Sequence, residues 1–495
     1  MGQPENQGAS TERRAWWLLA GLAIAITLVL AACGGSGDGA DAEADTETPS
    51  TAPGTEAEAG AETLDVSFSR DIQPVLAETC ARCHTGEGPG TAHFLLETAA
   101  DAEENALFIS DMVQIRAMPP WPASGLGVEL QHDWSLDDDQ IEAIIAWNRA
   151  GGAIDVDPTT PFDIETLPTL DDADVTLSPA TGGYDGEAGQ PDEYRCYVYD
   201  PGLTETAWLD GYEFVPDQTE VVHHAVGYLV DAELAEQAAA RDGEDGQPGW
   251  SCFGSSGLRD DELFLGWAPG QGPTELPSGS GMPLDAGDFL VIQVHYHYEE
   301  DAPEDLSQMR LRWSDDPDPA RVSVESYLAP AEIPCGPDES GPLCDRDAAI
   351  DAAIAKYGVE GTLGPFITQS CGFEPDDFVL VDGVVSGECD QSASIQGQIL
   401  GVFGHAHELG SAFRMTQNPG EDDERVLLDI DRWDFDWQFV YEPVEELFVA
   451  GDDTIRIECT WDRNLRDPQL EPAYIVWADG TDDEMCFATL MVLEG

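Results

Sequence analysis

The stretch FLVIQVHYHY, residues 289–298, decides the fold class of this chain. Two sets of residues alternate in it: Leu290, Ile292, Val294 and Tyr296, and Val291, Gln293, His295 and His297. An alternation with a period of two is typical of a β-strand. Side chains two apart on a strand share a face, so both imidazoles are expected to point the same way. The stretch therefore predicts a strand that carries two histidines on one face.

The chain around this stretch has the same character. After residue 174 the sequence consists of short alternating runs that are broken by Gly, Pro and Asp. Runs of this kind are typical of antiparallel sandwiches. The fold class is therefore predicted to be mainly β, with two tandem jelly-roll-like antiparallel β-sandwiches and a small all-α segment before them.

Six of the nine histidines stand in three tight groups in this β region. His223 and His224 lie in VVHHAVGY, and His405 and His407 lie in FGHAHELG. The i, i+2 spacing of His405 and His407 allows both to bind one ion from one face. The adjacent pair cannot do so on a regular strand and requires a bulge or a strand end. Grouped imidazoles predict metal sites, although imidazole alone suits Zn, Cu, Ni or Fe.

Composition restricts the kinds of partner. The 495 residues include 99 acidic and 20 basic side chains, which gives a formal net charge of −79. Nucleic-acid binding needs clustered cations, so this class of partner is excluded. We interpret the excess of carboxylates as a strongly solvated, salt-adapted surface, in preference to an acidic docking patch.

The N-terminal residues predict export. Residues 13–35, RRAWWLLAGLAIAITLVLAACGG, have a basic start, an apolar centre and small residues at the end. That pattern is typical of a signal peptide, predicted over 1–33, and its end resembles a bacterial lipobox with Cys33 as the lipidated residue. An uncleaved membrane anchor is the alternative. Residues 34–63 predict a disordered acidic linker, so the chain is expected in the cell envelope, outside the cytoplasm and lipid-anchored to the membrane.

The motif CARCH predicts a covalent haem c. Cys80 and Cys83 are spaced for thioether bonds to two haem vinyl groups, and the adjacent His84 can reach the iron. A zinc or redox CxxC is the alternative, and the histidine that follows the second cysteine argues against it. Residues 135–150 predict a helix with Ser135 as its N-cap, which resembles the last helix of a small class I cytochrome c. The haem domain is predicted over 64–155, with a linker over 156–173.

The sixth ligand of the haem is expected to be a thioether, as in a high-potential electron carrier. Met118 in RAMPPW is the first choice because the prolines after it stop a helix and leave it on a loop. The alternatives are Met112, His93 and His132.

Four motifs occur in a fixed order over residues 174–494: VVHHAVGY; LGWAPGQGPTELPSGSG leading into FLVIQVHYHY; GHAHELG; and TDDEMCFATLMV. This order resembles that of the copper type II, ascorbate-dependent monooxygenases, the family of dopamine β-monooxygenase and the peptidylglycine α-hydroxylating enzyme. The resemblance implies two sandwiches, over 174–330 and 331–495, that each hold one copper ion. An electron-transfer copper would be bound by His223, His224 and His295, and an oxygen-binding copper by His405, His407 and Met485. His297 matches no ligand of the family and is expected beside His295, as a hydrogen-bonding group or an alternative ligand.

The number of cysteines left for disulfide bonds fits an exported protein. Eleven cysteines less Cys33, Cys80 and Cys83 leave eight, and an even number in an oxidising compartment predicts four disulfides. The family resemblance implies the pairs Cys196–Cys252 and Cys459–Cys486. Cys335–Cys344 and Cys371–Cys389 are predicted from proximity in the sequence alone.

These inferences predict an exported copper-dependent monooxygenase that hydroxylates a substrate C–H bond with O2. Electrons would arrive through the haem from an ascorbate-like reductant or from a respiratory or small redox protein. The peptide-amidating members hold the substrate carboxylate with an Arg two residues before the HxH, where this chain has Phe403. They also use an Asn and a Tyr just after the Met-Cys pair, where Phe487 and Thr489 stand here, so a small apolar or aromatic substrate is expected. The alternative is a non-catalytic copper-binding or electron-transfer lipoprotein on the same scaffold.

Overall fold

A computed structural model describes residues 65–495 except 87, 165–167, 187–191, 253–255, 259–261, 299–302, 358–360, 479 and 481. The predicted signal peptide, the linker over 34–63 and Cys33 lie outside these residues. Residues Thr63–Gly495 form one compact unit, so the boundaries predicted within it at 155, 173 and 330 remain predictions. None of the helices that the structure describes has the length and apolar character of a membrane span.

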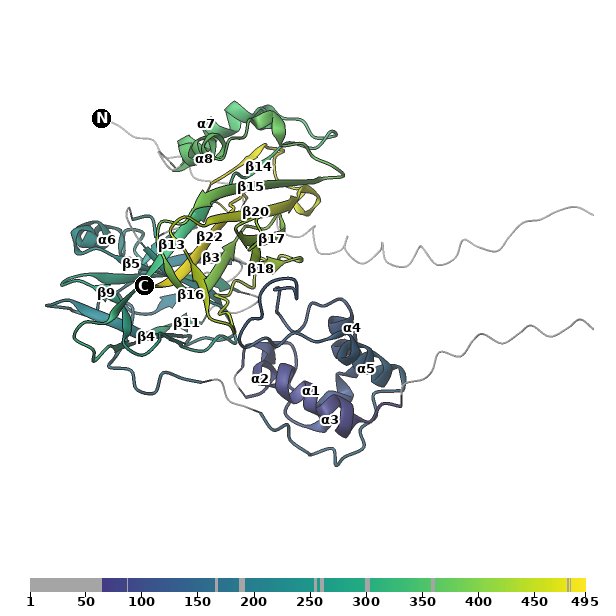
Figure 1. Cartoon of the computed structure of the whole chain (residues 1–495). Helices are drawn as coiled ribbons and strands as arrows, with labels where there is room; N and C mark the ends of the chain where they lie inside the picture. The colour runs from purple at the N-terminus through teal and green to yellow at the C-terminus, as the bar shows by residue number, and fades with distance from the viewer. Residues whose placement is uncertain are drawn as a thin grey trace, which may run out of the picture. The chain divides into compact units, whose positions relative to one another are not determined.

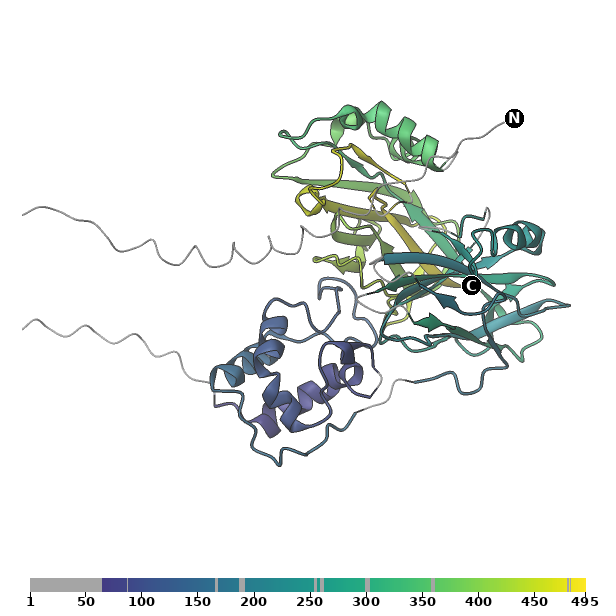
Figure 2. The ribbon, with the colours of Figure 1, turned by 180° about the vertical axis from the view of Figure 1, so that it is seen from behind.

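The helices of residues 68–149 form a group of their own, drawn in purple and blue in Figures 1 and 2. Their apolar faces enclose a core that includes Phe68, Ile72, Ile109, Ile144 and Trp147. The elements are η1 (Phe68–Ile72), α1 (Gln73–Val75), η2 (Leu76–Cys80), α2 (Ala81–His84), η3 (Pro89–Ala92), α3 (Ala99–Glu104), α4 (Ala106–Gln114) and α5 (Asp138–Arg149).

Helix α5 begins later than the sequence predicted. Its N-cap is Asp137 and not Ser135. The Asp137 carboxylate accepts a hydrogen bond from the backbone N–H of Gln140 at 2.7 Å, and the Gln140 side-chain oxygen accepts from the Asp137 N–H at 2.9 Å. This reciprocal pair satisfies two N–H groups that the first turn leaves open, so it fixes the start of the helix.

The rest of the chain is mainly β, as predicted, and its first half is a sandwich of two antiparallel layers around one core. One layer has the strand order β6-β3-β10-β5-β7, and the other contributes β1-β12-β4-β9 to a larger sheet. The strands are β1 (Val175–Leu177), β3 (Asp192–Tyr199), β4 (Ala207–Val215), β5 (Val222–Val230), β6 (Trp250–Ser251), β7 (Glu262–Trp267), β9 (Ser280–Leu284), β10 (Phe289–His297) and β12 (Gln308–Trp313).

The second half is built in the same way. The larger sheet continues through β13-β22-β16-β19, and a layer with the order β15-β20-β17-β18 encloses the second core with it. The strands are β13 (Ala320–Leu328), β15 (Val384–Ser392), β16 (Gly397–His405), β17 (Gly410–Gln417), β18 (Arg425–Ile430), β19 (Leu447–Val449), β20 (Thr454–Asp462) and β22 (Phe487–Glu494). Strand β13 pairs with β9 in parallel at its start and with β22 from Val322 to Leu328, so one sheet joins the two sandwiches.

Strand β10 is the central strand of its layer, between β3 and β5. Leu290, Ile292, Val294 and Tyr296 face the core between the two layers. His295 therefore lies on the opposite face, as the alternation of the sequence predicts.

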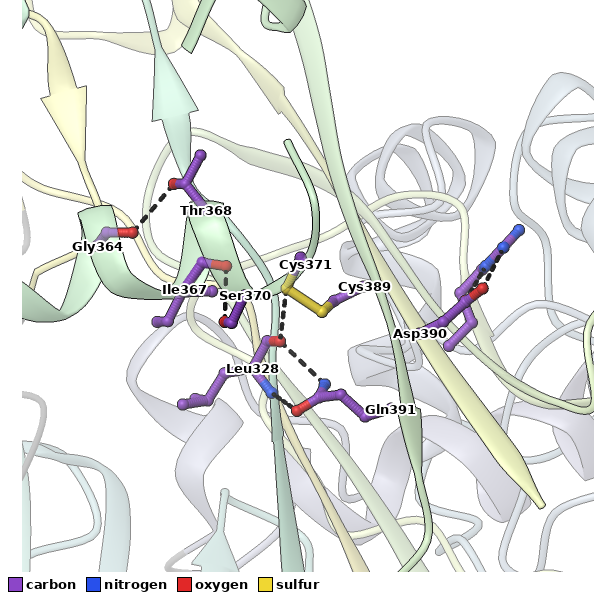
Figure 3. The surroundings of a disulfide bond; sticks show 10 residues. Leu328, Gly364, Ile367, Thr368, Ser370, Cys371, Cys389, Asp390 and Gln391 are labelled. Atoms are coloured by element: carbon purple, nitrogen blue, oxygen red, sulfur yellow. Dashed lines mark hydrogen bonds and ion pairs between the residues drawn. A yellow bond between two sulfur atoms is a disulfide. The ribbon is translucent and has the colours of Figure 1, made fainter. Parts of the chain in front are cut away.

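Two helices form a cap on the second sandwich together with the disulfides Cys335–Cys344 and Cys371–Cys389. Helices α7 (Arg346–Tyr357) and α8 (Leu363–Ser370) lie together next to β14 (Glu332–Ile333), which pairs with β21 (Ile475–Val476) (Figure 1). Cys371, directly after α8, is bonded to Cys389 of β15 (Figure 3). The Cys371 sulfur lies 3.9 Å from the Leu328 carbonyl oxygen, so the bonded pair lies beside the end of β13 (Figure 3). The Gln391 side chain donates to the same carbonyl at 3.0 Å.

All four predicted disulfides are present, and Cys80 and Cys83 are the free cysteines among the described residues. Cys196–Cys252 joins β3 to the segment after β6, and Cys459–Cys486 joins β20 to the start of β22. Cys486 directly follows Met485, so this disulfide anchors the chain next to that residue.

Candidate metal centres

Three of the predicted ligands come together. His223, His224 and His295 each offer a ring nitrogen, and these nitrogens all lie within 4.8 Å of one another. In the pairing of β5 with β10, His295 is opposite His224 and Tyr296 is opposite Val222. His223 is thus the extra residue of a β-bulge, which is the feature that the adjacent histidines required. The bulge lets two neighbouring side chains reach the same point.

The spacing of this three-histidine cluster fits a metal ion. The Nδ1 atoms of His224 and His295 are 3.3 Å apart, and two ligands about 2.1 Å from one ion at a tetrahedral angle are separated by about that distance. Burial lowers the pKa of His224 well below its usual value, with the neighbouring imidazoles His295 and His223 acting in the same direction. A neutral imidazole is the form that binds a metal.

The cluster is held from two sides. The ring of Tyr194 on β3 stacks on His295 with 4.2 Å between centroids and 6° between planes. His223 is the partly exposed member, and its Nε2 lies 3.8 Å from a carboxylate oxygen of Asp436. The Tyr194 ring therefore covers one side of the cluster, and solvent has access to the other side, at His223 and Asp436.

His405 and His407 form a second pair, with ring centroids 5.1 Å apart and planes at 80°. Strand β16 ends at His405, so His407 lies in the turn that leads to β17, and the two histidines do not share the regular strand that the sequence predicted. Burial lowers the pKa of His405 to about 4 and that of His407 to about 3. Both rings are therefore neutral at physiological pH.

The hydrogen bonds of this pair assign the tautomers. His405 Nδ1 lies 2.5 Å from the side-chain oxygen of Gln438, whose amide nitrogen donates to the Phe435 carbonyl at 2.7 Å. His407 Nδ1 lies 3.2 Å from the Asp483 carbonyl. Because an oxygen of either kind only accepts, each Nδ1 carries the proton and each Nε2 keeps its lone pair. The pair thus offers two Nε2 atoms as ligands.

Glu484 connects the second pair to Met485, although nothing in its local sequence distinguishes it from the other acidic residues. Its buried carboxylate accepts from the backbone N–H groups of His407 and Leu409, at 2.8 and 2.6 Å, and from the Trp461 indole at 2.9 Å. Burial raises the pKa of Glu484 to about 8, and these donors act against that rise. Met485 is the next residue and is 4% exposed, so its backbone is fixed beside the turn that carries His407.

One segment without regular structure, residues 433–439, contacts both histidine groups. The ring of Phe435 is 6.0 Å from His224 and 6.1 Å from His407. The centroids of the two imidazoles are therefore no farther apart than these two distances added together, about 12 Å. The two candidate metal centres therefore lie close together and share contact with one aromatic ring.

The predicted haem ligands line one cavity. Cys80, Cys83, His84 and Met118 border it, together with Trp437 and residues of the loop after β7. His84 is buried, its Nδ1 lies 3.2 Å from the Phe94 carbonyl, and its ring is stacked 4.1 Å from that of Phe94. The carbonyl fixes the proton on Nδ1, so Nε2 keeps the lone pair that an iron ligand needs.

The alternatives for the sixth ligand divide into two groups. His93 lines the same cavity as Met118. Met112 and His132 are not among the described residues that border it. The side chain of His297 lies outside what the structure describes, so its predicted role beside His295 remains a prediction.

Two phenylalanine rings lie next to His405. The ring of Phe403 lies 6.3 Å from His405 with 15° between planes, and Phe487 lies 6.3 Å from it edge-on. Phe403 is buried, and Thr489 is also buried on β22. These rings give the second pair an apolar wall.

Comparison with known proteins gives little support for any family. No family model matches the chain, and no curated protein matches it. The solved structures that resemble it include a Paenibacillus xanthan lyase, at 11% identity and a TM-score of 0.16, over 68% of this chain and 28% of that one. Others are allantoicase, at 10% identity and 0.14, over 61% and 80%, and Bacillus subtilis oxalate decarboxylase, at 10% and 0.12, over 67% and 77%. The chain spans about a quarter of the xanthan lyase, and similarities at these TM-scores carry no argument about its function.

Proposed function

We propose that this chain is an exported, lipid-anchored monooxygenase with one haem c and two copper ions, related to the ascorbate-dependent copper monooxygenases. Its substrate would be a small apolar or aromatic molecule that is hydroxylated at a C–H bond with O2. One observation carries the proposal: a cluster of three imidazoles and a second pair of imidazoles both contact the ring of Phe435.

The two donor sets differ in a way that suits two roles. His223, His224 and His295 would hold one copper with imidazole alone, a set that tolerates both Cu(I) and Cu(II). His405, His407 and Met485 would hold the other, and the soft thioether favours Cu(I). Copper bound by these ligands supplies one-electron transfer at the first site and activation of O2 at the second.

The protein side chains would control orientation and access. The Gln438 and Asp483 oxygens hold the Nδ1 protons of His405 and His407, so Nε2 of each ring keeps the lone pair with which it would bind the ion. Phe403 and Phe487 exclude water next to His405. The partly exposed Phe487 ring would offer an aromatic substrate a surface to pack on. Neither residue can pair with a substrate carboxylate, which favours an apolar substrate.

The cavity bordered by Cys80, Cys83, His84 and Met118 suits the haem. Two thiols, one imidazole and one thioether are the groups that covalent attachment and axial ligation require. A haem in this position would supply electrons one at a time from an external donor, either an ascorbate-like reductant or a small redox protein.

The test measures copper, haem and O2 together. The exported protein is loaded with copper, reduced with ascorbate, and mixed with air-saturated buffer containing ethylbenzene or phenethylamine. We expect about two copper ions and one haem per chain, and O2 consumption with hydroxylated product. The matched control is Met485→Ile, which should keep the haem and the first copper and form no product.

The alternative function predicts a different result from the same samples. A copper-binding or electron-transfer lipoprotein would hold haem and copper, yet its reduced form would persist in air and no product would form. That result would overturn the monooxygenase proposal.

A further inference from the structure

Trp437 contacts two of the sites described above. It is one of the residues that border the cavity of Cys80, Cys83 and His84. Its ring system lies 6.2 Å from the imidazole of His223, a member of the three-histidine cluster. One aromatic residue therefore contacts both the haem cavity and a ligand of the first candidate copper site.

Part of the wall of the haem cavity is made by a loop of the sandwich that carries the three-histidine cluster. Pro269 and Gly270 follow β7, the edge strand that pairs with β5, and both border the cavity. A Cβ atom added to Gly270 would lie 3.7 Å from the Cys83 sulfur. The backbone of the first sandwich thus reaches the atom through which Cys83 would bind a haem vinyl group.

Trp437 is held in place by its neighbours. Its backbone N–H donates to the Asp434 carbonyl at 3.2 Å, and its ring stacks on Phe439 with 6.3 Å between centroids and 16° between planes. The next residue, Gln438, holds His405, and the residue before it, Asp436, lies 3.8 Å from His223. The backbone of Trp437 is therefore anchored between two residues that contact the histidine groups, and its ring packs on Phe439.

From these contacts we propose that Trp437 is the residue through which an electron passes from haem c to the copper held by His223, His224 and His295. The inference rests on the proposed function. One electron leaves ferrous haem, which becomes ferric, and Cu(II) becomes Cu(I). No bond forms or breaks and no proton moves. The haem is then reduced again by a one-electron donor of the ascorbate class.

The experiment follows the electron directly and does not depend on hydroxylation. In the copper-loaded, haem-containing protein without O2, the haem is photoreduced by a flash and its reoxidation is followed by its visible absorption band. In Trp437→Leu we expect this internal reoxidation to slow at least several-fold. Trp437→Phe keeps an aromatic ring in the gap and should recover part of the rate.

A matched control removes an indole from the same segment. Trp433→Phe changes a residue that packs on Phe413 in the second core and does not border the cavity. Its rate should equal that of the wild-type protein. For every variant, pulsed EPR between Cu(II) and ferric haem, the haem potential and the copper content should match the wild type.

The outcomes separate the two proposals. Equal rates in Trp437→Leu and wild type would overturn the role of Trp437 and leave the proposed function standing. A changed copper–haem distance or lost copper in Trp437→Phe would show that the residue is structural, which also overturns it. A wild-type protein that binds no haem or no copper would instead overturn the proposed function.

Discussion

At the scale of single residues, the site depends on groups that hold the imidazoles and are not ligands themselves. Gln438 and the Asp483 carbonyl fix which nitrogen of His405 and His407 carries the proton. Such partners keep a ligand in the correct tautomer and orientation, so their loss weakens metal binding even though no ligand is removed.

Gln438→Leu tests this dependence. The change removes the acceptor of the His405 Nδ1 proton, and copper affinity at the second site should fall roughly 10- to 100-fold. Affinity is measured by titration against a competing chelator. Gln438→Glu keeps an acceptor oxygen and is the control, with an affinity close to that of the wild type. Equal affinity in all three proteins would mean that His405 needs no partner.

Met485→Ile tests the thioether. Isoleucine is apolar and of similar size, so the buried site should lose less than about 1.5 kcal/mol of the free energy of unfolding. The change deletes the soft ligand, and X-ray absorption of the reduced protein should show a Cu–S contribution in the wild type that is missing in the variant. The same copper environment in both proteins would identify Met485 as a core residue and would count against the two-copper proposal.

At the scale of the elements, the sequence was informative wherever the pattern is local. The alternation in residues 289–298 placed His295 on the face away from the core, and the adjacent His223 and His224 required the bulge that β5 has. The start of α5 was predicted two residues early, because Ser135 and Asp137 are both good caps and only the Gln140 side chain decides between them.

Other parts of the site could not be predicted, because they depend on tertiary packing. Phe435, Trp437 and Gln438 lie in a segment without regular structure between β18 and β19, and no periodicity marks them. Glu484 looked like one more surface acid in a chain of 99 acidic residues. Its role follows from burial and from four N–H donors that converge only in the folded chain.

The disulfides lead to a prediction at this scale. Cross-linking stabilises mainly by restricting the unfolded chain, and the effect grows with loop length. Removal of Cys196–Cys252, with a separation of 56 residues, should cost about 4 kcal/mol, and removal of Cys335–Cys344, with a separation of 9, about 2.5 kcal/mol. Urea denaturation of the two double alanine variants measures both values. The reverse order would show that native packing, and not loop length, determines the contribution of each bond.

At the scale of the whole molecule, the state of the cysteines reports on maturation. The four disulfides leave Cys80 and Cys83 as the free thiols of the described residues. Protein exported with its haem and lipid should have no titratable thiol when denatured without reductant, because Cys33 and both haem cysteines are then modified. Protein made without haem attachment should show the two thiols of Cys80 and Cys83. Free thiols in the haem-containing protein would contradict attachment at CARCH.

The net charge of −79 dominates the electrostatics of the molecule. Ion pairs such as those of Arg312 with Asp172, Asp210 and Glu275 are stabilising, but 20 basic residues cannot neutralise 99 acidic ones. Repulsion between the remaining carboxylates favours the expanded, unfolded chain. Salt weakens the repulsion between carboxylates, which stabilises the folded chain, and it also weakens the ion pairs, which destabilises it. The larger of the two effects determines whether stability rises or falls with salt.

We therefore expect the unfolding temperature to rise when sodium chloride increases from about 0.01 M to about 1 M, as the screening length falls from about 30 Å to about 3 Å. Thermal unfolding followed by circular dichroism measures the change. Most of the rise should occur below about 0.15 M, where the screening length has already fallen to about 8 Å.

Sodium sulfate at equal ionic strength is the control, because exclusion of sulfate from the protein surface adds stability at high concentration by a different route. A rise with sulfate and none with chloride would mean that the carboxylates are too far apart to repel one another. A fall with chloride would mean that ion pairs such as those of Arg312 contribute more than the repulsion does.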